Sequence, residues 1–177
     1  MDAWGNKLDQ VAQTVAEMAA IGMGIEKDAF TKRMEGGAHL LAPTGFDLES
    51  KEEGEGTVIS GFNSDIGLLT VRGKGRYPGL QVWTRNWKKK AVKIPEGCLL
   101  VQAGMTFEHV TGGYVPASFH EIVYTRDCKD IVIRNQLENA WHGRSNKFWT
   151  VSSTLFSHFR NDVSVAPMSQ LRHLHDM

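Results

Sequence analysis

The chain has 177 residues, of which 41% are hydrophobic and 23% charged, as in an ordinary globular protein. Lys and Arg number 20, as do Asp and Glu, so the charge favours neither nucleic acid nor an anionic membrane surface as a partner. No apolar run approaches the roughly 20 residues of a membrane helix, and the N-terminus has no signal-peptide pattern. Cys98 and Cys128 form no paired-cysteine motif, so we expect reduced thiols and a cytoplasmic protein.

The first segment of the chain predicts an amphipathic helix that begins near Asp2 and ends at Gly22. Its apolar residues recur at three- and four-residue spacing, which places them on one face. These residues are Trp4, Leu8, Val11, Val15 and Met18. A second, short helix is expected over residues 25–34, and we assign residues 1–36 to an N-terminal helical segment packed on the core.

From residue 37 to residue 165 the pattern predicts a β domain, because short β-prone runs alternate with glycine- and proline-rich breaks. The expected strands are residues 39–42, 57–62, 67–71, 80–84, 91–94, 99–103, 119–125 and 150–157. Such spacing is typical of a sandwich or barrel. Residues 128–146 interrupt it with mixed helical and loop character. Residues 166–177 are expected to form a polar tail in which His173 and His175 are solvated.

A series of short motifs follows in a characteristic order over most of the chain. They are Gly61-Phe62-Asn63-Ser64-Asp65, Pro78-Gly79-Leu80-Gln81-Val82, Gly97-Cys98-Leu99-Leu100-Val101, Thr111-Gly112-Gly113, Phe119-His120 and Thr150-Val151-Ser152. Together they resemble the isopenicillin N synthase-like branch of the Fe(II)/2-oxoglutarate-dependent dioxygenases. The resemblance implies a mainly β fold, the double-stranded β-helix or jelly roll, with a helix packed against one sheet.

The resemblance also implies a site. In the family, a His-x-Asp pair and a distant His bind Fe(II), and an Arg-x-Ser pair binds the far carboxylate of 2-oxoglutarate. Asp65 and His120 keep two metal-ligand positions, and Ser152 keeps one co-substrate position. Asn63 stands where the family has its first His, and Thr150 stands where it has the Arg. A neutral amide is a weak ligand and a Thr cannot neutralise a carboxylate, so binding of both groups should be weakened or lost.

The spacing of Asn63 and Asp65 supports a shared site, because residues at i and i+2 of a strand point to the same face. Each residue also has a plainer interpretation. His120 could be a packed strand histidine, Asp65 a residue that ends a strand, and Asn63 a turn residue without a metal role.

Other residues could replace the missing groups. His109 is a candidate for the third ligand. Arg126, Arg144 and Arg160 are candidates for a displaced cation. Otherwise we expect no Arg or Lys to reach the co-substrate position.

Two functions remain open. The chain could oxidise an unidentified small molecule with Fe(II) and 2-oxoglutarate, or it could be a lapsed relative that acts as a binding module. The sequence lacks the N-terminal segment that such enzymes usually carry before the helix, so a fragment, a short isoform and a reduced family member are all open. An uncovered sheet edge could favour self-association.

Overall fold

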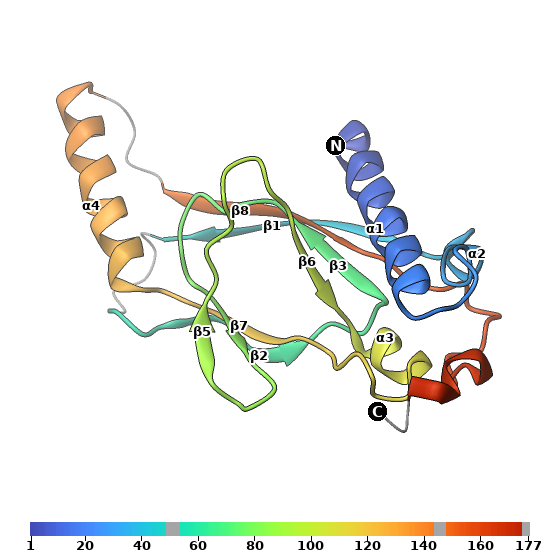
Figure 1. Ribbon diagram of the computed structural model, residues 1–177. Coiled ribbons are helices and arrows are strands. Elements are labelled where there is room, and N and C mark those ends of the chain that lie inside the picture. Colours follow the sequence, from blue (N-terminus) through green and yellow to red (C-terminus); the bar gives the residue numbers. More distant parts are fainter. Residues whose placement is uncertain (49–53, 144–147, 175–177) are drawn as a thin grey trace.

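The computed structural model of the protein describes residues 1–48, 54–143 and 148–174. Two four-stranded antiparallel sheets make up its body (Figure 1), with strand orders β1-β8-β3-β6 and β2-β7-β4-β5. The first comprises β1 (Leu40–Asp47), β8 (Trp149–Phe156), β3 (Leu69–Arg72) and β6 (Leu100–Ala103). The second comprises β2 (Val58–Ser64), β7 (Phe119–Val123), β4 (Leu80–Trp83) and β5 (Lys89–Ala91). The predicted mainly β jelly roll with an N-terminal helix is confirmed.

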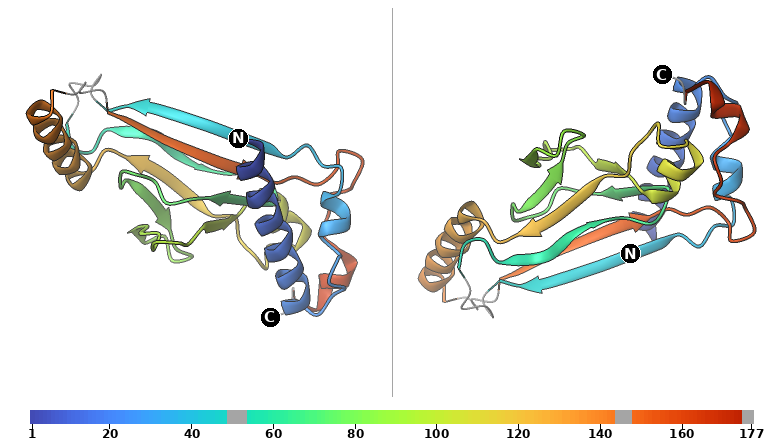
Figure 2. Two further views of the ribbon diagram at one scale, coloured as in Figure 1. Left: turned by 90° about the horizontal axis from the view of Figure 1, so that it is seen from above. Right: turned by 90° about the horizontal axis from the view of Figure 1, so that it is seen from below.

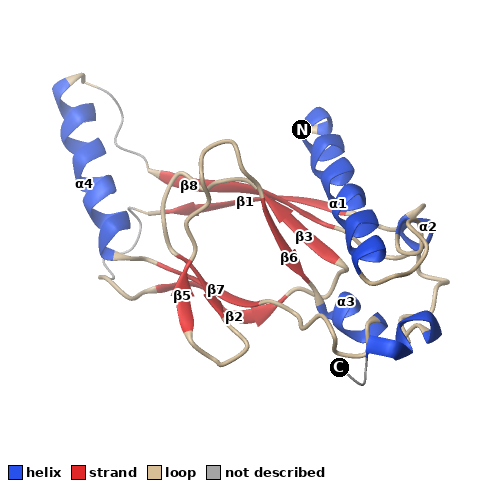
Figure 3. Cartoon of the chain, viewed as in Figure 1, coloured by secondary structure: helices blue, strands red, loops and turns tan. Residues whose placement is uncertain are grey.

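The helices cover the two ends of this sandwich. They are α1 (Asp2–Gly22), α2 (Thr31–Met34), α3 (Met105–Val110), α4 (Arg126–Trp141) and the 3-10 helix η1 (Ser169–Leu174). Figure 2 shows α1, α2 and η1 gathered at one end and α4 at the other, and Figure 3 shows how little helix lies between them. No helix among the described residues is long and apolar enough to cross a membrane.

Helix α1 packs against β3 and β8 through a face made largely of alanine. Its buried residues are Leu8, Ala12, Ala16 and Ala20. The predicted face was wrong at its two ends, since Trp4 is 38% exposed and Met18 is 65% exposed. Alanines at four-residue spacing present almost no side chain, so the helix can lie close to the sheet. A search for hydrophobic residues alone therefore selected larger side chains that neighbour these alanines in the sequence.

Several elements differ from the predicted ones. Strand β1 continues through Pro43, whereas the predicted strand ends at residue 42. The proline is tolerated because β1 is an edge strand and an edge position does not require the missing N–H. Residues 105–110 form α3, which was not predicted. The mixed segment after Thr125 is a regular helix, α4, whose first turn is capped because the Cys128 N–H donates to Thr125 Oγ1 at 3.2 Å.

The last described residues pack onto the body of the molecule. Met168, Leu171 and Leu174 are buried in the same hydrophobic cluster as α1 and β3. His173 Nε2 lies 3.2 Å from the carbonyl oxygen of Met23, at the end of α1. His175 lies outside the described residues. The segment from residue 166, expected to be a polar tail, therefore contributes apolar side chains to the core as far as residue 174.

Candidate functional site

A cavity of about 1020 Å³ opens between the two sheets. Its walls come from β1, β2, β3, β4, β7 and β8, from the loops after β3 and β5, and from the start of α4. All the site residues predicted from the sequence line it. They are Asn63, Asp65, His120, Thr150 and Ser152. The jelly roll thus brings together residues from distant parts of the chain at one internal surface.

Asp65 and His120 lie side by side in this cavity. Asp65 Oδ1 is 4.0 Å from His120 Nε2, and the two side chains are only 11% and 5% exposed. The pairing of β2 with β7 produces this arrangement, because Asn63 is the register partner of His120 and Asp65 directly follows β2. The predicted proximity of these side chains is therefore present in the structure.

The backbone and side chain of Asp65 are both held in place. Thr70 Oγ1 donates to Asp65 Oδ2 at 2.7 Å, and the Met105 N–H donates to the Asp65 carbonyl oxygen at 2.8 Å. Close approach of the chain here requires Gly104, because a Cβ at that position would collide with the Gly67 carbonyl oxygen. With Oδ2 engaged by Thr70, the other carboxylate oxygen is the one turned toward His120.

The ring of His120 is oriented by its other nitrogen. Nδ1 lies 3.3 Å from the Ser118 carbonyl oxygen, which can only accept, so Nδ1 carries the proton when this hydrogen bond forms. In the neutral ring, Nε2 then presents its lone pair to Asp65 Oδ1. Their separation of 4.0 Å is too long for a hydrogen bond. Two facing acceptors of this kind suit a cation bound between them.

The third ligand position is the weak one. Asn63 Nδ2 donates to the Gly61 carbonyl oxygen at 2.6 Å, which leaves the neutral Oδ1 as the atom available to a cation. Within the described ranges, no three His, Cys, Asp or Glu side chains form a group that could hold a metal ion. His109 is no replacement, because it lines a different pocket, beside α3. The residues fit a divalent cation held by two strong ligands, Asp65 and His120.

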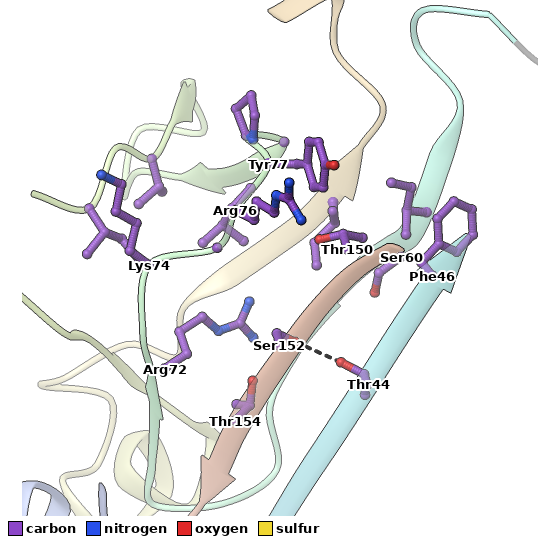
Figure 4. A pocket seen from close by; sticks show the side chains of 18 of the residues that line it. Thr44, Phe46, Ser60, Arg72, Lys74, Arg76, Tyr77, Thr150, Ser152 and Thr154 are labelled. Carbon is purple, nitrogen blue, oxygen red and sulfur yellow. Dashed lines mark hydrogen bonds between the residues drawn. The ribbon is translucent and has the colours of Figure 1, made fainter. Parts of the chain in front are cut away.

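The co-substrate side of the cavity is formed by β8. Ser152 Oγ lies 2.7 Å from Thr44 Oγ1 on β1, and Thr150 is the register partner of Phe46. Figure 4 shows Ser152 and Thr154 beside the side chain of Arg72, whose guanidinium points toward Ser152. The expectation that no Arg or Lys reaches this position was therefore wrong.

The cation of this position lies on β3 and is none of the three arginines that the sequence suggested. Arg126 and Arg160 do not line the cavity, and Arg144 lies outside the described residues. The sequence did not suggest Arg72, because the strand predicted over residues 67–71 ends one residue before it. The available signal was its spacing from Thr70, since side chains two residues apart on a strand share a face.

The surroundings of Arg72 are unusual for a charged group. Its Nε is buried without a hydrogen-bond partner among the described residues. Burial lowers the pKa of Arg72 below its usual value, and the nearby Asp65 carboxylate opposes that shift. An arginine remains protonated in proteins, so the cavity holds a permanent and incompletely compensated positive charge.

The cavity and the two sheets around it define a class of protein: the chain has the jelly-roll fold of the 2-oxoglutarate- and Fe(II)-dependent oxygenases. No protein-family model and no curated protein sequence matches the chain. Solved structures do match it, and they confirm the dioxygenase-like fold that the motifs predicted.

Three of these structures illustrate the likeness. A Caulobacter crescentus protein described as a 2OG-Fe(II) oxygenase family member has 20% identity and a TM-score of 0.73, over 96% of this chain and 49% of its own. A full-length Neurospora crassa protein, solved in complex with alpha-KG, has 17% identity and a TM-score of 0.75, over 97% and 49%. JOX2, solved with 2OG, Fe and JA, has 16% identity and a TM-score of 0.70, over 96% and 44%. The chain thus spans about half the length of these proteins.

Proposed function

We propose that the chain oxidises a small molecule in an Fe(II)- and 2-oxoglutarate-dependent reaction, with Asp65 and His120 as its metal ligands. The observation that carries the proposal is the pair of facing acceptors, Asp65 Oδ1 and His120 Nε2, 4.0 Å apart inside the cavity. The cavity, at about 1020 Å³, is large enough for a co-substrate and a small substrate together. The presence of 2OG and Fe in the structurally similar JOX2 supports the choice of cofactors.

Each residue near the proposed ligands has a positioning role. Fe(II), when bound with 2-oxoglutarate and dioxygen, supplies the oxidising capacity of such a site. Thr70 holds one oxygen of Asp65 and leaves the other free, while the Ser118 carbonyl fixes the ring of His120 with Nε2 facing inward. The walls of the two sheets exclude water from most of this surface, because both ligand side chains are nearly buried.

The alternative function is a binding module without turnover, and Asn63 is the observation that favours it. A site with two strong ligands binds metal more weakly than one with three, and Asn63 offers only a neutral oxygen. Under this alternative, the cavity would bind a small molecule but would not retain Fe(II) well enough to use it.

The two functions can be separated with purified protein, Fe(II), ascorbate and 2-oxoglutarate. Anaerobic titration measures Fe(II) affinity, and succinate release under air measures turnover. For the oxygenase, we expect wild type to bind Fe(II) and release succinate, Asp65→Ala to do neither, and Asp127→Ala, also on the cavity wall, to behave as wild type. Asn63→His should raise Fe(II) affinity at least about tenfold, by restoring an imidazole ligand.

Two outcomes of this experiment would contradict the oxygenase proposal. Iron binding that is unaffected by Asp65→Ala would rule out the proposed ligands. If Asn63→His binds Fe(II) tightly and still releases no succinate, the oxygenase function is wrong and the binding module is favoured.

A further inference from the structure

We propose that Arg72 takes over the role of the arginine missing at position 150, and that its guanidinium, with the hydroxyl of Ser152, binds the distal carboxylate of a short dicarboxylate. The other end of that ligand would lie at Asp65 and His120. The identification of the ligand as 2-oxoglutarate rests on the proposed function. The anion site itself rests on the position and surroundings of Arg72.

The strand geometry places Arg72 at a suitable distance from the proposed metal position. Thr70 and Arg72 are two residues apart on β3 and share its inner face, and Thr70 directly contacts Asp65. Two residues of a strand advance roughly 6.7 Å. A five-carbon diacid has roughly 5 Å between its terminal carbons, from four carbon–carbon bonds of about 1.5 Å each. Such a ligand can extend from Asp65 and His120 to Arg72.

The register of the sheet brings Ser152 to the same point. Arg72 is paired with Thr154 across β3 and β8, and Ser152 is the next residue on β8 that faces the same way. Figure 4 shows the guanidinium directed toward Ser152, whereas Thr150 lies farther along β8. The arginine position has thus moved to the neighbouring strand while the Ser152 hydroxyl has stayed in place.

The Ser152 hydroxyl can donate to an anion. It is 2.7 Å from Thr44 Oγ1, and either hydroxyl can be the donor in that hydrogen bond. When Thr44 donates, the proton of Ser152 remains available to a carboxylate oxygen. A carboxylate at this point would accept from both Ser152 and Arg72.

Arg72 is half-buried, and it lacks the partners that an enclosed cation normally has. Its Nε is enclosed and makes no hydrogen bond, and no carboxylate of the described chain lies within ion-pair distance of it. Asp65 acts on it only at longer range. Buried charges in proteins are usually paired, so the missing partner of Arg72 is most simply an anionic ligand.

The other cations of the cavity wall differ in this respect. Lys74 is exposed and pairs with Glu96 at 2.8 Å, and the exposed Arg76 lies 5.6 Å from the centre of the Tyr77 ring. Both already have interactions and contact with solvent. Lys93 and Arg134, which also line the cavity, are exposed as well. Among the described cations of the wall, only Arg72 therefore combines partial burial with a buried, unused donor, so the proposal concerns Arg72 and not the wall as a whole.

The test is the binding of glutarate in excess EDTA, measured by calorimetry on the full chain. Removing metal isolates the anion site from iron chemistry. We expect wild type to bind glutarate, and Arg72→Gln to lose about 30-fold or more in affinity, the effect of leaving a carboxylate without its charged partner. Arg76→Gln, the matched control on the same wall, should stay within about threefold of wild type. The neutral diamide of glutarate should not compete.

A rescue variant guards against a folding defect. Arg72→Gln combined with Thr150→Arg should regain glutarate binding, because it returns the cation to the other strand beside Ser152. If wild type does not bind glutarate, or if Arg72→Gln binds it as well as wild type does, the proposal is wrong and Arg72 only balances the charge of Asp65. Glutarate binding without iron-dependent turnover would leave the anion site intact and overturn the proposed function alone.

Discussion

The hydroxyl of Thr70 determines which oxygen of Asp65 faces His120. Replacing Thr70 by Val removes this hydrogen bond while keeping the shape, so the carboxylate can rotate. We expect Fe(II) affinity to fall about 10- to 100-fold, as when other groups that orient a metal ligand are lost. Anaerobic Fe(II) titration measures it. Thr154→Val, also buried on the cavity wall, is the control, and equal affinities for the two variants would contradict this role of Thr70.

The two cysteines should differ sharply in reactivity. Cys98 is exposed, whereas Cys128 is buried at the start of α4, and burial raises the pKa of the Cys128 thiol to about 11. Because the thiolate is the reactive form, Cys128 should be inert at pH 8. A thiol-reactive chromogenic disulfide should therefore modify Cys98 rapidly, and Cys128 only after guanidinium is added. Rapid modification of both thiols in the native protein would show that Cys128 is not protected.

The sequence predicted the proximity of Asp65 and His120, because the order of the motifs along the chain reflects how the strands of a jelly roll pair. It could not predict Arg72. A resemblance transfers roles only to positions that match, and Arg72 stands at a position to which the resemblance assigned no role. Recognising it needed the register between β3 and β8, which places its side chain beside Ser152.

At the scale of elements, the contact between α1 and the sheet depends on small residues. Ala16 is buried where α1 lies on β3, so Ala16→Leu would force the helix away from the sheet. We expect it to lower the free energy of unfolding by about 1–3 kcal/mol. Ala3→Leu, on an exposed position of the same helix, should change it by less than about 0.5 kcal/mol. Urea unfolding followed by circular dichroism compares the two, and equal values would show that α1 is not tightly packed.

The elements also show where periodicity succeeds and where it fails. It found α1 and most strands, because their apolar residues alternate or recur over enough residues to be seen. It missed α3, since six residues make too few turns to show a period. It ended β1 at Pro43, because whether a proline is tolerated depends on a strand's place at the sheet edge, which only the assembled sheet reveals.

At the scale of the whole molecule, a histidine pair links α1 to the ends of β1 and β8. His39 Nδ1 accepts from the His158 backbone N–H at 3.1 Å, and His39 Nε2 lies 3.7 Å from Asp9 Oδ1. Burial, followed by the charge of His39, lowers the pKa of His158 below its usual 6.5. Below that pH the unfolded chain binds the extra proton more readily, so stability falls as the pH drops.

The measurement is thermal unfolding between about pH 7.5 and pH 5.5. We expect the midpoint of wild type to decrease over this range, and that of His158→Gln to decrease less, because Gln does not titrate. An equal decrease in the two proteins would place the effect in other groups.

Strand β8 lies between β1 and β3, yet it is the last strand of the described chain. Residues 40–47 therefore cannot pair before residues 149–156 have been made, because β1 has no other strand partner among the described residues. Contacts so far apart in sequence make folding slow. On the ribosome, a chain that ends before residue 149 would expose β1 and β3 without their common neighbour, together with a cavity that lacks its β8 wall. We therefore expect a late, aggregation-prone stage during synthesis, which ends when β8 inserts.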